Sequence, residues 1–366
     1  MLHEPHSDLW MLFDYEGVKR ALYDHEAFSS VVAPPEAMTS QWLVFADPPR
    51  HTKLRALIMR AFTPRAVASL EPRIQALSRE LLEQTIERGE MDLAADFSVP
   101  LPLMVIAEMF GAPLEDQPRF KRWSDVIMAL GYAVAGSEET ARVQGEFASV
   151  SSEMRVYLRD LAEQRRAVPK DDLLTRLVEA EVDGARLTEE ELLGFFQLLL
   201  SAGHETTTNL LNNALLCLVE HPEQLARLRA EPGLLPSAIE EVLRYRSPVQ
   251  AMFRVTRSEV SLHGQVIPAG KMVLAMIGSA NRDPRKFHDA ERFDITREPN
   301  PHIAFGHGIH FCIGAPLSRL EARVGLSVLL ERVRGFALAS DAPWEPRKAI
   351  HVHGPTRLPI RFEPRP

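Results

Sequence analysis

One long apolar helix constrains the fold of this chain more than any other feature. Thr188, followed three residues later by Glu191, forms a capping box and predicts a helix start. The next strong stop is the pair His221–Pro222, so the helix extends for roughly 50 Å. Such a helix is expected to run through the core, because both of its halves are apolar, with Leu192, Phe195, Phe196, Leu199, Leu210, Leu211, Leu215 and Leu218.

The middle of this helix has a composition that disfavours a helix interior. Residues 202–209 read Ala-Gly-His-Glu-Thr-Thr-Thr-Asn. Gly costs about 1 kcal/mol relative to Ala there, and a buried carboxylate is costly unless it is paired or neutralised. We interpret Gly203 as a place where the helical hydrogen bonds open, and Glu205 with Thr206 as a proton relay. The alternative is a kinked core helix that holds a buried water.

The remaining pattern predicts a mainly α protein with small β-sheets. Strands are expected at 252–256, 260–262 and 272–276, with a hairpin turn near His263–Gly264, and a last helix at about 315–334. Strands and helices do not alternate as in a doubly wound fold. Two loops, 31–42 and 131–137, are either plain surface loops or covers of a pocket.

Composition limits the classes of partner. The chain of 366 residues has 42 basic and 50 acidic side chains, a net charge of −8 that disfavours nucleic acid. Two cysteines exclude a disulfide scaffold and favour a reducing compartment. No stretch approaches the ~18 apolar residues of a membrane span. We expect a cytoplasmic protein without a nucleic-acid or membrane partner.

A glycine-rich loop around Cys312 carries the strongest chemical signal. Residues 305–316 read Phe-Gly-His-Gly-Ile-His-Phe-Cys-Ile-Gly-Ala-Pro. The thiol comes just before a predicted helix, where free N–H groups and the helix dipole favour its thiolate form. Glycines let backbone amides approach the sulfur, and Phe305 and Phe311 make its surroundings apolar. A thiolate held in this way is a nucleophile or a metal ligand.

Competing interpretations of this loop are weaker. A structural buried Cys needs neither the glycines nor the helix start. Zinc would find nearby imidazoles, but a Cys-x-x-Cys half-site is missing and the spacing His302, His307, His310, Cys312 is unusual for zinc. A dinucleotide loop would need Gly where Phe311 stands. The interpretation that remains is a thiolate ligand of haem iron.

The order of motifs resembles the cytochrome P450 superfamily from Trp10 to about Phe362. The family's haem-ligand loop, Phe-x-x-Gly-x-x-x-Cys-x-Gly, is matched by Phe305, Gly308, Cys312 and Gly314, and its bacterial form also by Gly306 and His310. Its oxygen-activation motif is similar to Ala202-Gly203-His204-Glu205-Thr206. Its Glu-x-x-Arg helix is similar to Glu241–Arg244, and Arg292 resembles the third member of that salt-bridge cluster.

Positions for the two haem propionates also resemble the family. His51 and Arg55, four residues apart after Asp47-Pro48-Pro49, share one helix face and resemble the early propionate-binding helix. Arg254 resembles the propionate-binding Arg of a strand, and His310 completes the set. Charge-assisted hydrogen bonds from these four residues are expected to orient the cofactor.

The resemblance implies a single cytochrome P450-like domain over residues 1–366, with the long central helix crossing the haem. The segment before Asp8 is shorter than the family usually has, so a shortened N-terminal cap is expected. The implied cofactor is haem b (iron protoporphyrin IX), with Cys312 as the iron ligand and with Glu205 and Thr206 delivering protons. The implied cofactor-binding residues are His51, Arg55, Ala202, Gly203, Arg254, Phe305, Gly306, His310, Cys312 and Gly314.

The implied activity is that of a haem-thiolate monooxygenase, which inserts one atom of dioxygen into a small lipophilic substrate by hydroxylation or epoxidation. Since no flavin or nicotinamide domain is recognised, electrons are expected from a ferredoxin or flavodoxin-type donor with its reductase. Arg319 and Arg323 either belong to its docking patch or are plain solvated arginines. The alternatives are a peroxide-driven peroxygenase, which often lacks the acid–alcohol pair, and a non-catalytic haem-based gas binder.

Overall fold

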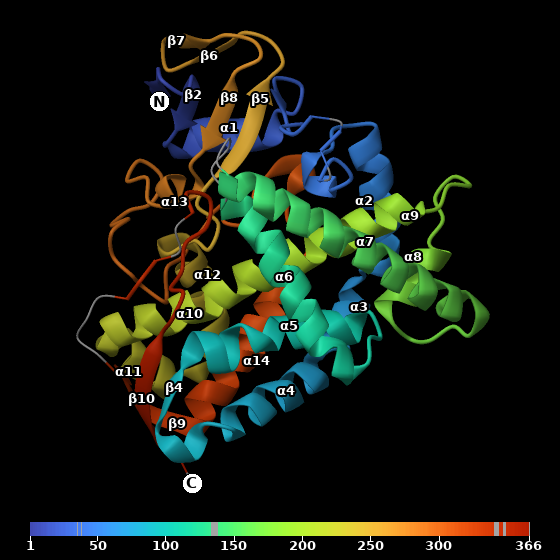
Figure 1. The fold of residues 1–366 in the computed structure, drawn as a ribbon. Coiled ribbons are helices and arrows are strands. Elements are labelled where there is room, and N and C mark those ends of the chain that lie inside the picture. Colours follow the sequence, from blue (N-terminus) through green and yellow to red (C-terminus); the bar gives the residue numbers. More distant parts are fainter. Residues whose placement is uncertain (35, 38, 133–137, 340–343, 347–348, 366) are drawn as a thin grey trace. The chain divides into compact units, whose positions relative to one another are not determined.

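The computed structural model describes residues 1–34, 36–37, 39–132, 138–339, 344–346 and 349–365 (Figure 1). Its chain forms two compact units, each built from separate stretches of sequence. The first unit consists of Met1–Val32, Leu70–Leu101 and Thr206–Pro366, and the second of Ala33–Ser69 and Pro102–Glu205. The loop predicted at 131–137 falls mostly outside the described residues, as do positions 35 and 38 of the loop at 31–42.

The described strands all belong to the first unit and form three small sheets. Five strands, in the order β1-β2-β8-β5-β3, make the largest sheet, in which β2 and β8 are parallel. The others are a sheet in the order β4-β10-β9 and the pair β6-β7. The strands are β1 (Leu2–Glu4), β2 (Leu9–Leu12), β3 (Phe28–Ser29), β4 (Glu90–Asp92), β5 (Met252–Thr256), β6 (Val260–Leu262), β7 (Gln265–Ile267), β8 (Met272–Ala275), β9 (Val333–Leu338) and β10 (Pro359–Pro364).

The predicted strands and hairpin are confirmed. His263 and Gly264, with φ of 50° and 73°, make the two-residue turn between β6 and β7. Positive φ at both positions gives a turn whose twist matches that of the flanking strands, and Gly adopts it without strain. The alternation of side chains along β2 sends Trp10 and Leu12 into a core that α1 also lines.

Seven α-helices also belong to the described part of the first unit. The pairs α4–α14 and α12–α14 pack against each other, and α1 packs on β8 of the large sheet (Figure 1). These helices are α1 (Tyr15–Tyr23), α4 (Glu71–Glu83), α10 (His204–Glu220), α11 (Pro222–Ala230), α12 (Leu235–Tyr245), α13 (Ile277–Ala280) and α14 (Ala315–Arg332). The first two residues of α10 belong to the second unit.

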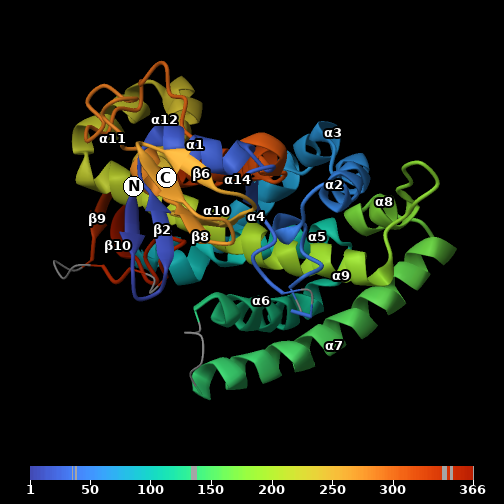
Figure 2. The same ribbon diagram turned by 90° about the horizontal axis from the view of Figure 1, so that it is seen from above.

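The second unit is helical around an aromatic core. Phe120 and Trp123 of α6 are fully buried, and the Phe196 ring of α9 meets the Phe110 and Phe120 rings edge to face, with centroids 4.8 and 5.5 Å away. Figure 2 shows α6 and α7 side by side, and α7 also packs on α8 and α9. The helices are α2 (Arg50–Ala61), α3 (Pro64–Ala68), α5 (Pro100–Met109), α6 (Gln117–Tyr132), α7 (Glu138–Ala167), α8 (Leu173–Glu179) and α9 (Glu189–Leu198). The first two residues of α5 belong to the first unit.

The predicted long helix is present as successive helical segments. The Thr188–Glu191 capping box starts α9, a π-helical segment follows at Leu199–Gly203, and α10 continues to Glu220. The predicted opening of α-helical hydrogen bonds near Gly203 is thereby confirmed. No helix within the described part of the chain has the length and apolar character that a membrane crossing requires.

Candidate functional site

Cys312 lies in a tight loop directly before α14. The Cys312 amide donates a 2.9 Å hydrogen bond to the Phe305 carbonyl, and α14 begins at Ala315 with Pro316 in its first turn. Pro suits that turn because its missing N–H has no helical partner there. The Cys312 side chain is exposed, whereas the other cysteine, Cys217, is buried, and burial raises the pKa of its thiol to about 12. Of the two thiols, Cys312 is therefore the one accessible to a cofactor.

Glycines determine the path of this loop. Gly306 and Gly308 have φ of 76° and 74°, in the left-handed region that other residues rarely adopt. A Cβ on Gly308 would come within 2.7 Å of the Tyr23 Cα, so no side chain fits there. A Cβ on Gly314 would lie 3.8 Å from the Cys312 Sγ. The first two glycines thus allow the turn, and the third keeps side chains away from the sulfur.

A charged network holds the first residue of the loop motif. Glu240 of α12 accepts two 2.7 Å hydrogen bonds from the Arg319 guanidinium of α14 and lies 3.0 Å from the His302 Nε2. Burial opposes ionisation of Glu240, but the hydrogen bonds from Arg319 and His302 outweigh it and lower its pKa to about 2. The Arg319 guanidinium carbon also lies 4.4 Å from the centre of the Phe305 ring. Arg319 therefore ties α12 and α14 to Phe305.

The chemistry of this loop fits a haem held by one thiolate. Next to the exposed thiol, the Phe311 side chain is 41% exposed, and its ring centre lies 6.4 Å from that of Phe305. A thiol beside exposed aromatic carbon provides both an iron ligand and a contact surface for a flat apolar cofactor. In the described part of the chain, no three His, Cys, Asp or Glu side chains are grouped so as to hold a metal ion.

The Glu-x-x-Arg pair forms the expected ion pair. Both side chains are fully buried, and the Arg244 guanidinium donates two 2.8 Å hydrogen bonds to the Glu241 carboxylate. Arg244 also donates to the carbonyls of Asn281, Ala290 and Arg292, at 3.0, 2.8 and 3.0 Å. One buried guanidinium thus fixes the chain between α13 and residue 292 to α12.

The third member of this cluster is Arg297, and the prediction for Arg292 is wrong. The Arg297 Nε lies 3.2 Å from both Glu241 carboxylate oxygens, and its guanidinium is largely buried. The Arg292 guanidinium is 65% exposed and lies 3.9 Å from Asp294. Arg292 contributes only its carbonyl oxygen, because the chain turns at residues 289–292 and directs its side chain outward.

Two residues of the first unit that are predicted to bind propionates, Arg254 and His310, lie on a strand and on a short turn respectively. Arg254 stands opposite Val273 in the β5–β8 pairing, is 2% exposed, and donates a 2.7 Å hydrogen bond to the Phe253 carbonyl. His310 ends the short 3-10 turn Gly308–His310, two residues before the cysteine. A buried guanidinium needs an acceptor to offset its desolvation, so Arg254 is suited to a carboxylate, and its haem contact stays a prediction.

The second unit holds the predicted oxygen motif from Ala202 to Glu205, and Thr206 begins the next stretch of the first unit. Ala202 and Gly203 end the π-helical segment, and a Cβ on Gly203 would lie 3.2 and 3.3 Å from side-chain carbons of Leu199 and Ile106. The Ser124 hydroxyl of α6 donates to the Leu200 carbonyl at 3.3 Å and lies 2.8 Å from the His204 Nδ1. Side chains of α6 therefore support the segment where α-helical bonding changes.

The helix predicted to bind propionates, α2, is also in the second unit. The predicted start after Asp47-Pro48-Pro49 is confirmed, since α2 begins at Arg50 and the His51 amide donates to the Asp47 carbonyl at 2.9 Å. His51 is 2% exposed, and Arg55, one turn later, is half-buried. Their shared helix face is as expected, and their contact with haem stays a prediction.

Three threonines, Thr206, Thr207 and Thr208, follow the buried acid Glu205. Glu205 is 5% exposed. The Thr207 hydroxyl donates to the Ser318 hydroxyl at 3.2 Å, and the Thr208 hydroxyl donates to the Ser98 carbonyl at 2.9 Å. These two bonds attach α10 to neighbouring segments of the first unit. Thr206 directly follows Glu205 in the chain, and its part in the proton relay stays a prediction.

Glu321 of α14 is a buried acid that the sequence analysis missed. It is 2% exposed, and its Oε2 has no hydrogen-bond partner among the described residues. Burial raises the pKa of this carboxyl to about 8. Glu321 is therefore protonated at neutral pH. It lies one helical turn beyond Ser318, which bonds Thr207.

A family model described as Cytochrome P450 matches residues 2–349. The chain belongs to the cytochrome P450 family. It is 42% identical to the cytochrome P450 monooxygenase PikC of Streptomyces venezuelae, over 97% of this chain and 85% of PikC. It is 41% identical to the cyclomarin C epoxidase CymV of Salinispora arenicola, over 98% of this chain and 93% of CymV.

The fold comparison gives the same result for this P450. The crystal structure of CYP109E1 from Bacillus megaterium in complex with testosterone matches with a TM-score of 0.89 and 40% identity, over 98% of this chain and 95% of that chain. The predicted fold class, mainly α with small sheets and P450-like, is confirmed. This P450 is an oxidoreductase of the monooxygenase class, and its family implies a haem cofactor, dioxygen, a redox partner and lipophilic substrates.

Several supporting residues could not be found from motifs. Asn300 donates to Glu241 at 3.2 Å, and Arg297 reaches the same carboxylate from 56 positions along the chain. Nothing in the local sequence distinguishes Arg297 from Arg292, because their difference depends on the path of the intervening loop. Glu321 had a usable signal, since its spacing from Leu317 and Val324 places this acid on the apolar face of α14.

Proposed function

We propose that this P450 is a haem-thiolate monooxygenase that uses haem b and hydroxylates or epoxidises a small lipophilic molecule. The observation that carries the proposal is the exposed Cys312 thiol on a glycine-lined loop that leads into α14. When bound, haem with a thiolate ligand supplies the activation of dioxygen and the transfer of one oxygen atom.

The residues of this chain supply a ligand, an orientation and protons. Cys312 is proposed as the iron ligand, and the N–H groups at the start of α14 favour its anionic form. His51, Arg55, Arg254 and His310 are proposed to bind the propionates. Phe305, Gly306 and Gly314 are proposed to form the cofactor face of the loop, and Gly314 leaves space at the sulfur.

Proton delivery is assigned to Glu205 and Thr206. A carboxyl that is 5% exposed can hold and release a proton without exchanging it freely with bulk water. The neighbouring Thr206 hydroxyl both accepts and donates hydrogen bonds, so it can pass that proton on. The small residues Ala202 and Gly203 are proposed to leave room for dioxygen beside this pair, where the π segment ends.

A lipophilic substrate and a separate electron donor complete the proposal. The relatives named above include a testosterone complex and a cyclomarin C epoxidase, both consistent with apolar substrates. A ferredoxin or flavodoxin-type donor with its reductase is proposed for the electrons. Arg319 and Arg323 each form two hydrogen bonds with one carboxylate, of Glu240 and Glu71 respectively. Their charges are thus largely compensated, which weakens the idea that they bind the donor.

Replacing each cysteine by serine tests the iron ligand. We expect Cys312→Ser to abolish the thiolate-type absorbance spectrum of the ferrous carbon monoxide adduct, and Cys217→Ser, the matched control, to keep it. Retention of that spectrum in Cys312→Ser would overturn the assignment. Product formed with reductant, donor and dioxygen, and absent with peroxide alone, would distinguish a monooxygenase from a peroxygenase.

A further inference from the structure

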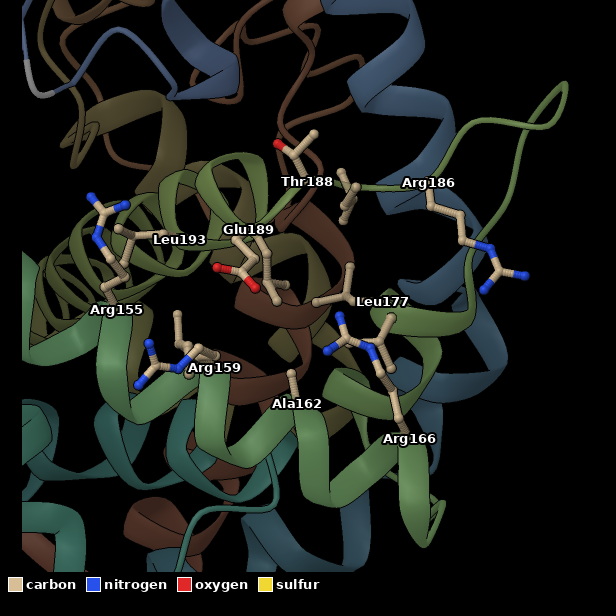
Figure 3. A pocket seen from close by; sticks show the side chains of 13 residues that line it. Arg155, Arg159, Ala162, Arg166, Leu177, Arg186, Thr188, Glu189 and Leu193 are labelled. Carbon is tan, nitrogen blue, oxygen red and sulfur yellow. The ribbon is translucent and has the colours of Figure 1, made fainter.

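A pocket of about 280 Å³ in the second unit lies between α7, α8 and the start of α9 (Figure 3). None of the residues assigned above to haem, dioxygen or proton delivery lines it. We propose that this pocket binds a small amphipathic carboxylate: an apolar chain of about ten non-hydrogen atoms that ends in one carboxylate group. The proposal is independent of the chemistry at Cys312.

Arginines follow one face of α7 along this pocket. Arg155, Arg159, Ala162 and Arg166 are separated by four, three and four residues, the spacing of one side of a helix. Figure 3 shows Ala162 at the pocket wall between Arg159 and Arg166. Arg186, from the segment between α8 and α9, adds a fourth guanidinium, which points away from the other three (Figure 3).

Of these four guanidinium groups, those of Arg159 and Arg166 are poorly compensated by carboxylates. The other two have partners, since Arg155 is paired with Glu190 and the Arg186 Nε lies 2.9 Å from the Glu181 carboxylate. For Arg159 the only ion pair among the described residues is with the adjacent Asp160, at 3.5 Å.

Arg166 forms no ion pair with any described residue. One carboxylate of the lining, that of Glu189, projects into the pocket (Figure 3). After Glu189 is counted against one guanidinium, one positive charge of the Arg159–Arg166 pair remains for a ligand anion.

The rest of the lining is apolar and suits a hydrocarbon chain. Leu158 of α7 and Leu177 of α8 are 3% and 0% exposed, so they form a dry floor. The other apolar residues are Ala162, Val178, Leu187, Leu192 and Leu193. A pocket with a charged rim and an apolar floor binds a molecule with one charged end better than a neutral or a fully polar molecule. The charged end pairs with the rim, and the hydrocarbon chain is buried against the floor.

Calorimetric titration of the holoprotein with decanoate tests the proposal. We expect Arg166→Gln to weaken decanoate binding by about tenfold, the loss of one charge-assisted hydrogen bond. Glu189→Gln should strengthen it, because a like charge is removed while the Thr188–Glu191 capping box stays intact. Arg142→Gln is the control, since Arg142 lies on the same helix, pairs with Glu146 and is outside the pocket.

Two further measurements keep the result unambiguous. Ala162→Phe should fill the pocket and remove this binding, and decanol should bind at least tenfold more weakly than decanoate. Haem absorbance recorded in the same titration reports separately on any decanoate that enters the haem site. Unchanged decanoate binding in Arg166→Gln, or equal binding of decanol, would overturn the proposal, whereas neither result would affect the carbon monoxide spectrum that tests Cys312.

Discussion

At the scale of single residues, three adjacent threonines of α10 differ in what they hold. Thr207 and Thr208 bond Ser318 and the Ser98 carbonyl, whereas Thr206 adjoins the buried Glu205. We expect Thr206→Ala to bind haem and substrate normally but to lower product formed per electron by about tenfold, with hydrogen peroxide released instead. Thr207→Ala is the control and should keep the coupling of the wild type. Equal coupling in both variants would remove Thr206 from the proton relay.

Glu321 makes a residue-scale prediction about pH. Its pKa in the folded protein is about 8, above its ordinary value of 4.5, so the folded state holds this proton more tightly than the unfolded state does. The resulting stability is complete below pH 4.5 and is lost as the pH rises to 8. The loss is roughly 1.4 kcal/mol per pH unit. Glu321→Gln has no carboxyl to ionise, so its free energy of unfolding should not show this loss. Relative to the wild type, that free energy should therefore rise by up to about 4 kcal/mol as the pH goes from 5 to 8.

Urea unfolding at pH 5 and pH 8 measures this difference. Glu331→Gln serves as the control, because Glu331 lies on the same helix, is 57% exposed and pairs with Arg79 at 3.4 Å. Its stability should follow that of the wild type at both pH values. If Glu321→Gln also follows the wild type, the Glu321 carboxyl is already neutralised by another group.

At the scale of elements, the buried Glu241 joins α12 to the loop that follows α13. Removing Arg297 leaves this carboxylate short of one cation and frees the carbonyls of His288 and Asp289, which Arg297 also bonds. We expect Arg297→Ala to lower the free energy of unfolding by about 3 kcal/mol, and Arg292→Ala by less than about 0.5 kcal/mol. Denaturant midpoints of the two variants give the comparison. A reversed order would restore Arg292 to the cluster.

Elements with local signals were predictable, and those set by distant contacts were not. The Thr188–Glu191 box and the His263–Gly264 turn depend on residues a few positions apart, so sequence alone places them. The π-helical geometry before His204 was predicted only as an opening of the helix, because its support comes from Ser124, about eighty positions earlier. Local sequence patterns report only on residues that are close along the chain. Contacts between distant residues, such as Ser124 and His204, form only when the chain folds.

At the scale of the whole molecule, each compact unit is assembled from separate stretches of sequence. Contacts between these separate stretches close long loops of chain, and closing long loops slows folding. Local sequence patterns do not reveal such contacts. The loop of Cys312 was recognisable because one short motif carries its glycines and the cysteine together. The arginine pocket was not, because α7, α8 and the start of α9 each contribute only part of its lining.

Because Cys312 is exposed and Cys217 is buried, thiol reactivity can measure how much of the protein has bound its cofactor. A soft alkylating reagent reacts with an accessible thiol and spares one that is buried with a pKa of about 12, so apoprotein should consume one equivalent, at Cys312. Once a prosthetic group engages that sulfur, alkylation should stop. Counting labelled peptides in a mass spectrum would then report the fraction of loaded molecules without any reference to colour or turnover.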